Sequence, residues 1–336
     1  MGSKKLMATI CAVIAALLYA IYIPASKLLL GHIEPAFLAS FLYLGAGLGI
    51  GVLYLIAAFR KKSVQEGLSR DDLPYTIGMI VLDIAAPILM MLGLSGVSSS
   101  NASLLNNFEI VATSIVALLV FKEVISKRLW LAILLITLAS ALLTAGDFSA
   151  ISLSFGSLFI VAATICWGVE NNLTKKISSK NTFQIVIVKG ICCGIGSGIV
   201  ALIKGEVFPQ GSYFASALLL GFVAFGLSIF FYVRSQKELG AAQTSAFYAL
   251  APFVGALLSF LFLRDAITTN FVISFLIMIV GTSLVVWDTL LVSHSHLHTH
   301  VIAMTRDGHV QIQTIEHVHT HKHFVTDKNH THPHQK

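Results

Sequence analysis

The sequence predicts an all-α integral membrane protein with ten transmembrane helices arranged as two inverted five-helix repeats. Three observations predict this fold. Hydrophobic residues make up 56% of the chain and charged residues only 11%, whereas roughly 25% of residues are charged in a soluble domain. Apolar runs of about twenty residues recur along the chain, each long enough to cross the ~30 Å hydrocarbon core of a bilayer. Segments of the first half also return in the second half.

The clearest repeat is residues 101–123, which recur 142 positions later as residues 243–265. Each copy has a short polar start, a long apolar stretch and a basic–acidic pair at its end, Lys122-Glu123 or Arg264-Asp265. Shorter segments match at offsets of 148 and 147. These are residues 19–27 with 167–175, and 47–56 with 194–203.

The predicted spans follow one another without period-two alternation, which favours helices over a barrel. They cover about 6–30, 36–58, 74–95, 99–121, 129–145, 152–174, 182–203, 212–234, 242–263 and 270–291. The first span follows two lysines but is longer than a signal peptide's apolar region, so we expect it to be retained. The chain therefore divides into a first repeat at 1–146, a second repeat at 147–292 and a tail at 293–336.

The basic residues between the spans predict the orientation. If the N-terminus is cytoplasmic, the inner segments carry fourteen Lys and Arg residues, and the outer loops carry only Lys204 and Arg264. The positive-inside rule then places both termini in the cytoplasm. The net charge of +6 is accounted for by these loops, so no nucleic-acid partner is expected. Five helices per half invert the second repeat, an architecture that gives secondary transporters two packings around one midplane site.

The glycines at alternate positions in the second span, and those of the seventh, have spacings that let helices approach closely. The four cysteines all lie in apolar segments, so no disulfide framework is expected.

These features resemble the drug/metabolite transporter superfamily, EamA type. The resemblance covers about residues 6–291 and rests on the two repeats, on Trp167-Gly168, on Glu109 and Pro252 within the fourth helix of each repeat, and on the closing basic–acidic pairs. It implies a secondary active transporter of a small solute, such as a metabolite, an amino acid or a drug-like molecule. It further implies export across a bacterial plasma membrane, the inner membrane.

Ionisable side chains within the spans indicate a polar cavity, because each costs ~2.5–3.5 kcal/mol at mid-helix. We expect Glu109, together with Asp83, to bind a cationic part of the solute or to exchange a proton. Aromatic side chains would form the walls. The candidate cavity residues are Tyr19, Tyr22, Asp83, Asn106, Asn107, Glu109, Trp167, Glu170, Asn171, Lys189 and Tyr248. The alternative is an internal ion pair for Asp83 and Lys189, and ordinary packing for the aromatic residues.

The tail contains twelve of the thirteen histidines. The dipeptide Asp307-Gly308 is a hairpin signal, and a hairpin around it would place His294, His296 and His298 opposite His321, His319 and His317. Stacked imidazoles on one face form a site for zinc, nickel, cobalt or copper. The candidate ligands are His294, His296, His298, His300, His317, His319, His321 and His323. The alternative is a disordered, solvated tail.

Three classes of function follow. A small-solute transporter accounts for the repeats and the buried carboxylates. A divalent transition-metal transporter also accounts for the tail, although its spans lack His or Cys residues at ligand spacing. A non-transporting membrane sensor is the third, and no motif indicates an enzyme. The expected partners are the bilayer and a small solute, with proton coupling and a homodimer left open; no cofactor is required.

Overall fold

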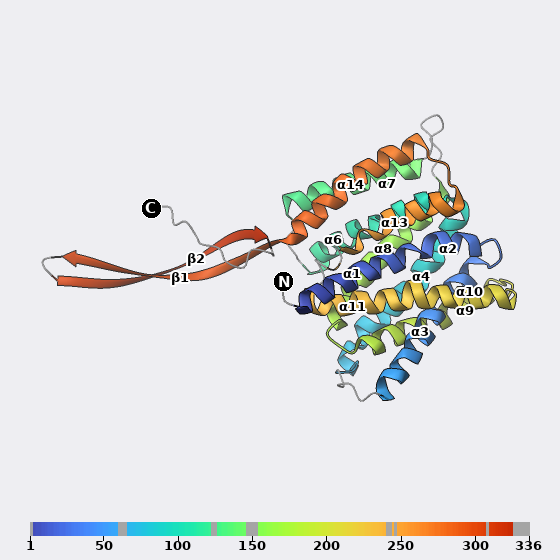
Figure 1. The fold of residues 1–336 in the computed structure, drawn as a ribbon, viewed down its shortest axis with the longest axis horizontal. Helices are drawn as coiled ribbons and strands as arrows, with labels where there is room; N and C mark the ends of the chain where they lie inside the picture. Colours follow the sequence, from blue (N-terminus) through green and yellow to red (C-terminus); the bar gives the residue numbers. More distant parts are fainter. Residues whose placement is uncertain are drawn as a thin grey trace.

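The computed structural model describes residues 3–59, 66–121, 126–145, 154–239, 244, 247–306 and 309–324 (Figure 1). The helices of the first half are α1 (Ser3–Ala20), α2 (Tyr22–Leu29), α3 (Pro35–Phe59), η1 (Arg70–Asp72), α4 (Leu73–Gly96), α5 (Ser99–Leu105), α6 (Phe108–Phe121) and α7 (Lys127–Ala145). Those of the second half are α8 (Phe155–Ile177), α9 (Thr182–Ile203), α10 (Gly211–Leu220), η2 (Gly221–Leu227), α11 (Ser228–Leu239), α13 (Ala251–Leu258), η3 (Ser259–Leu263) and α14 (Thr269–Leu290).

The helices confirm the prediction of a membrane-spanning bundle. Eight stretches of the described chain are long and apolar enough to cross a membrane. Of the two remaining predicted spans, α8 is long enough but carries Glu170, Asn171 and Asn172, which reduce its hydropathy. The other appears as the shorter apolar helix Ala251–Leu263, and the predicted start of that span, at 242–243, lies outside the described residues.

Two predicted spans are interrupted where the sequence analysis expected continuous helices. The first breaks at Ile21, between α1 and α2, and the fourth breaks at Asn106 and Asn107, between α5 and α6. A turn at Ala249 and Leu250 precedes α13 in the second half. At the repeat offset of 142, the break at Asn106–Asn107 corresponds to residues 248–249, so the turn overlaps the equivalent position. Discontinuous helices at matching positions of two repeats are the pattern found around transporter binding sites.

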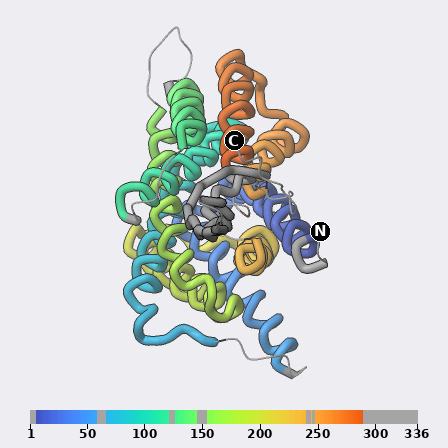
Figure 2. Tube along the Cα trace, turned by 90° about the vertical axis from the view of Figure 1, so that its left-hand side faces the viewer, coloured from blue at the N-terminus to red at the C-terminus, as the bar shows by residue number. Residues whose placement is uncertain are grey.

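The two halves are interleaved. The most extensive helix pairs join one half to the other: α4 packs on α8, α3 on α9, α7 on α14 and α1 on α11. The chain begins at one end of the bundle, whereas α8, the first helix of the second half, begins at the opposite end (Figure 1). Figure 2 looks onto the first of these ends, where α7 and α14 stand together at one edge, far from the end of α3. The repeats therefore have opposite directions within one body.

Glycines allow the close contact of α3 with α9. A Cβ atom on Gly190 would overlap the backbone of Gly47, and one on Gly45 would overlap the backbone of Leu218. Gly51, by contrast, faces open space. The packing role expected for these glycines is thus present at positions 45, 47 and 190.

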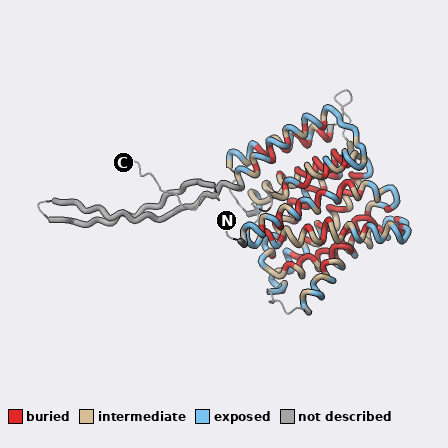
Figure 3. The backbone as a smooth tube through the Cα atoms, viewed as in Figure 1, coloured by how far each residue is buried: buried red, intermediate tan, exposed pale blue. Residues whose placement is uncertain are grey.

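The outer surface of the bundle is apolar. Buried residues lie between the helices and exposed ones face outward (Figure 3). Large hydrophobic side chains are among the most exposed, including Phe155 at 79% and Leu119 at 71%. Such a surface suits contact with lipid rather than with water.

Beyond α14 the chain continues as two antiparallel strands, β1 (Leu291–Arg306) and β2 (His309–Phe324). Their register pairs His294 with His321, His296 with His319, and His298 with His317. These are the pairs that the sequence analysis derived from a turn at 307–308. That turn and residues 325–336, which include the last histidines, lie outside the described residues, as do the side chains of both strands.

Candidate functional site

A cavity inside the bundle brings together residues from both halves. It is lined by Tyr19, Tyr43, Glu109, Trp167, Glu170, Asn171, Thr174, Lys189, Phe225, Ile229, Tyr232, Val233 and Tyr248. Seven of these are residues that the sequence singled out: Tyr19, Glu109, Trp167, Glu170, Asn171, Lys189 and Tyr248. They come from α1, α6, α8, α9 and the segment before α13.

One wall of the cavity contains a buried ionic cluster. The ammonium nitrogen Nζ of Lys189 lies 2.9 Å from Asp83 Oδ2 and 3.0 Å from Glu170 Oε1. The Tyr43 hydroxyl donates a hydrogen bond to Asp83 Oδ1 at 3.0 Å, and the Thr174 hydroxyl donates one to Glu170. The Asp83 side chain has no exposed surface. Asp83 therefore acts as the inner partner of Lys189, as the ion-pair alternative expected, while Glu170 and Lys189 border the cavity.

Glu109 also lines the cavity and lies in the first turn of α6. The side-chain amide of Asn171 donates to Glu109 Oε1 at 2.6 Å and is 3.4 Å from Thr113 Oγ1. The neighbouring amide of Asn172 donates to the Thr113 carbonyl oxygen at 3.1 Å. Two consecutive amides of α8 thus fix the start of α6. None of the ion pairs between described side chains includes Glu109.

The charges around the cavity do not balance. Three carboxylates, of Asp83, Glu109 and Glu170, face a single ammonium group, that of Lys189. A buried charge without a counter-charge is costly at low dielectric. A cation or a proton next to Glu109 would reduce the imbalance. The site can therefore take up a positive charge.

Aromatic rings form a further part of the cavity lining. The ring of Tyr19 lies 4.6 Å from that of Tyr22 and 5.0 Å from that of Tyr248, between ring centroids. The ring of Tyr232 is 4.9 Å from that of Tyr248. Tyr22 does not line the cavity but packs edge-on against Trp167, 6.4 Å away. The faces of such rings attract organic cations.

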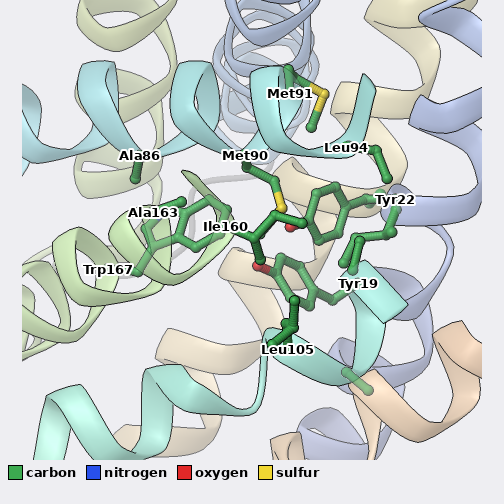
Figure 4. Close-up of a cluster of buried hydrophobic side chains, with 14 of the residues drawn as sticks. Tyr19, Tyr22, Ala86, Met90, Met91, Leu94, Leu105, Ile160, Ala163 and Trp167 are labelled. Atoms are coloured by element: carbon green, nitrogen blue, oxygen red, sulfur yellow. The ribbon is translucent and has the colours of Figure 1, made fainter. Parts of the chain in front are cut away.

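A buried apolar cluster closes the bundle towards the end where α4 ends and α8 begins. It contains Tyr22, Met90, Leu94, Leu105 and Ile160 (Figure 4). The ring of Tyr22 packs against the cavity residues Tyr19 and Trp167. The cluster therefore borders the cavity.

Polar contacts strengthen the same closed end. Lys27 Nζ donates to the carbonyl oxygens of Leu94, at 2.6 Å, and Val97, at 2.7 Å. The backbone N–H of Ser100 donates to Asp265 Oδ2 at 2.7 Å. These bonds tie α2 to the end of α4, and the loop after η3 to the start of α5.

Four candidates do not line the cavity, namely Tyr22, Asp83, Asn106 and Asn107, and several cavity residues were not anticipated. Asn106 and Asn107 form the break between α5 and α6; the Asn107 amide contacts Met278 Sδ at 3.6 Å. The unanticipated residues are Tyr43, Thr174, Phe225, Ile229, Tyr232 and Val233. Thr174 had a readable signal, because it follows Glu170 by one helical turn. The others lie in apolar runs, where the sequence does not show which side of the helix faces the cavity.

The fold and the site together define a class: a multi-pass membrane transporter built from two interleaved, inverted repeats. A family model described as the EamA-like transporter family matches the sequence twice, at residues 6–145 and 154–287. The chain belongs to the EamA-like transporter family.

Relatives and a solved structure agree with this assignment. An uncharacterized transporter of Methanothermobacter thermautotrophicus is 25% identical over 308 residues, covering 85% of this chain and 88% of its own. The uncharacterized transporter YyaM of Bacillus subtilis is 26% identical over 254 residues, which cover 70% of this chain and 79% of YyaM. A crystal structure with 17% sequence identity matches with a TM-score of 0.62 over 84% of this chain and 96% of its own; at that identity it supports the fold alone.

Proposed function

We propose that this protein is a secondary active transporter that moves a small solute with a cationic group across the plasma membrane by alternating access, in the direction of export. The observation that carries the proposal is Glu109. Its carboxylate borders the cavity, is held by Asn171 at 2.6 Å, and has no ion-pair partner among the described side chains. It lies beside a helix break that has a counterpart in the second repeat.

The mechanism is an exchange at one carboxylate. A solute ammonium group binds between Glu109 and the rings of Tyr19 and Tyr248. When the solute leaves, a proton binds to the Glu109 carboxylate. The empty protein can then change conformation without a buried negative charge that lacks a counter-charge. Lys189 stays paired with Asp83 and Glu170 throughout. Proton and solute therefore compete for one site, which couples their movements in opposite directions.

The contacts at the closed end of the bundle support the proposal that this arrangement is one state of the transport cycle. With the N-terminus and C-terminus in the cytoplasm, the closed end formed by Lys27 and Asp265 faces outward, and the cavity is on the cytoplasmic side of the seal. An exporter loads its solute in this state. Opening the outer end requires the bonds from Lys27 to Leu94 and Val97 to break.

A proteoliposome assay with Glu109→Gln tests the proposal. The full-length protein is reconstituted with a pH-sensitive dye inside, and a panel of organic amines, quaternary ammonium compounds and Zn²⁺ is added outside. Wild-type protein is expected to move protons when an accepted cation is present. The substitution Glu109→Gln is expected to abolish that flux, because a neutral amide neither holds a cation nor exchanges a proton.

The matched control is Glu238→Gln, which neutralises an exposed carboxylate on α11 and is expected to leave the flux unchanged. Transport by Glu109→Gln with the wild-type rate and pH dependence would remove Glu109 from the mechanism. Transport of Zn²⁺ alone would instead favour a metal carrier. The described side chains contain no group of three or more His, Cys, Asp or Glu residues arranged for a metal ion, so the bundle gives that alternative less support.

The histidine pairs of β1 and β2 support a second, separate role for the tail. The tail is proposed to bind zinc, nickel, cobalt or copper, because its register pairs His with His at three positions spaced two residues apart. Calorimetry of the full chain should detect Zn²⁺ binding at neutral pH that weakens in acid, since only neutral imidazole is a ligand. A variant ending at residue 292 is the control, and equal binding by both proteins would exclude the tail.

A further inference from the structure

A second cavity lies on the outside of the bundle, between α13 and α14, and is separate from the transport site. It is lined by Leu250, Phe253, Phe275, Ile279, Thr282, Ser283, Val286 and Trp287. Six of these eight side chains are apolar. α14 packs mainly against α7 rather than α13, so the two helices leave a groove that faces the lipid.

The length of the groove matches one leaflet of a bilayer. Its residues on α14 run from Phe275 to Trp287, which is twelve steps of the helix. At ~1.5 Å per residue this is roughly 18 Å, against roughly 15 Å for half of the hydrocarbon core. Trp287 lies near the end of α14, at the membrane face where the N-terminus also lies (Figure 1). The groove thus extends from that face to the middle of the membrane.

The end of the groove at this membrane face is bordered by an arginine. The guanidinium carbon of Arg128 lies 5.5 Å from the centroid of the Trp287 ring, and Arg128 is exposed. The nearby carboxylate of Asp288 accepts a hydrogen bond from Ser126 at 2.6 Å. No ion pair between described side chains includes Arg128. An anionic group is therefore the complement of this end.

Deeper in the groove lies Thr282. The residue is 7% exposed, and its buried hydroxyl has no hydrogen-bond partner among the described residues. It lies five residues, or roughly 7.5 Å along the helix axis, below Trp287. The ester groups of a lipid whose phosphate lies level with Trp287 would be at this depth.

We propose that the groove between α13 and α14 binds an anionic glycerophospholipid. Its phosphate lies at Arg128, its ester groups lie at the depth of Thr282, and one acyl chain runs along Ile279, Phe275 and Phe253. The site is independent of the transport cavity, and its existence does not depend on which solute is carried.

Fluorescence quenching by brominated lipids tests the site in the intact protein. Trp287 is 51% exposed and Trp130, on α7, is 48% exposed, so bulk lipid reaches the two rings to similar extents. One variant keeps only Trp287 (Trp130→Phe, Trp167→Phe), and its control keeps only Trp130 (Trp167→Phe, Trp287→Phe). Each is reconstituted with a small fraction of brominated phosphatidylglycerol or brominated phosphatidylcholine in an unbrominated mixture of both.

Brominated phosphatidylglycerol is expected to be enriched about fivefold over phosphatidylcholine at Trp287, the equivalent of ~1 kcal/mol for one arginine. Trp130 should show no such preference. In the variant with Trp287 alone, both Arg128→Gln and the groove-filling change Ser283→Phe should abolish the preference. Equal quenching by the two lipids at Trp287 would overturn the proposal. So would displacement of the brominated lipid by inorganic phosphate, since that result would indicate a site for the free anion.

Discussion

The two halves of the bundle place very different side chains at equivalent positions around one cavity. At the offset of 148 residues, Tyr22 in α2 corresponds to Glu170 in α8, and at 147 residues Leu42 in α3 corresponds to Lys189 in α9. All four are buried. The first half therefore has an aromatic and an aliphatic side chain where the second half has an ion pair.

This difference separates what is symmetric in the protein from what is not. The scaffold is symmetric. Exchanging the two halves converts the pair of α4 and α8 into the pair of α11 and α1, whereas α3 with α9 and α7 with α14 are pairs of equivalent helices. The side chains at the equivalent positions are not symmetric, because Glu170 and Lys189 of the second half have the uncharged counterparts Tyr22 and Leu42 in the first half. A symmetric scaffold offers two equivalent packings for alternating access. Under the proposed function, an asymmetric lining would give the solute one preferred orientation in the cavity.

The largest effect is expected from removing the only cation of the buried cluster. The substitution Lys189→Met leaves the carboxylates of Asp83 and Glu170, both within 3.0 Å of Lys189 Nζ, without a counter-charge. We expect a loss of ~3–5 kcal/mol in stability, measured by unfolding of the purified protein in detergent.

The control is Leu42→Met, the equivalent change in the first half, which should cost less than about 1.5 kcal/mol because it preserves volume and polarity. Adding Asp83→Asn and Glu170→Gln to Lys189→Met should recover part of the loss. If Lys189→Met and Leu42→Met were equally stable, the cluster would not contribute to holding the two halves together.

A smaller effect is expected where glycines of the two halves are in contact. The substitution Gly190→Ala places a Cβ atom against the backbone of Gly47, so α3 and α9 must separate. We expect a cost of ~1–3 kcal/mol, seen as a lower unfolding temperature.

The comparison is Gly51→Ala, at a position in α3 with nothing within 4 Å of the added atom. Alanine is favoured over glycine in a helix by ~1 kcal/mol, so this variant should be neutral or slightly more stable. Equal destabilisation by both changes would argue against the close helix contact.

The smallest effect is expected at Asn171, because only one bond to the cavity carboxylate is lost. The substitution Asn171→Ala removes the donor at 2.6 Å from Glu109 Oε1. Hydrogen bonds to charged groups contribute ~1.5–3 kcal/mol, so solute affinity in proteoliposomes should fall about tenfold while the fold persists. Ile23→Ala, the equivalent position in the first half, should leave affinity unchanged. An effect of Ile23→Ala as large as that of Asn171→Ala would mean that α8 has no special role.

Much of the fold could be predicted from the sequence, because hydropathy and the internal repeat act along the chain. The breaks at Ile21 and at Asn106–Asn107 could not be predicted, since both lie within otherwise continuous apolar runs. The low hydropathy of α8 has its cause in Glu170 and the two asparagines after it.

The site was predicted only in part. Buried charges such as Glu109 and Lys189 stand out in an apolar sequence, because each is costly there. The partners of these charges depend on which helix surfaces pack together. A single sequence does not show those contacts. Tyr43 shows the limit: it lies in an apolar run, yet it donates a hydrogen bond to Asp83.

The central claim is that one cavity opens in turn to each side of the membrane. The direct test is a single cysteine, Ile229→Cys, in a variant whose four native cysteines are replaced. Ile229 lines the cavity but takes no part in the polar network. A membrane-impermeant maleimide should label this position from either face, and an accepted solute should change the ratio of the two rates. Labelling from one face only, whatever solute or pH is applied, would contradict alternating access and indicate a membrane sensor that does not transport.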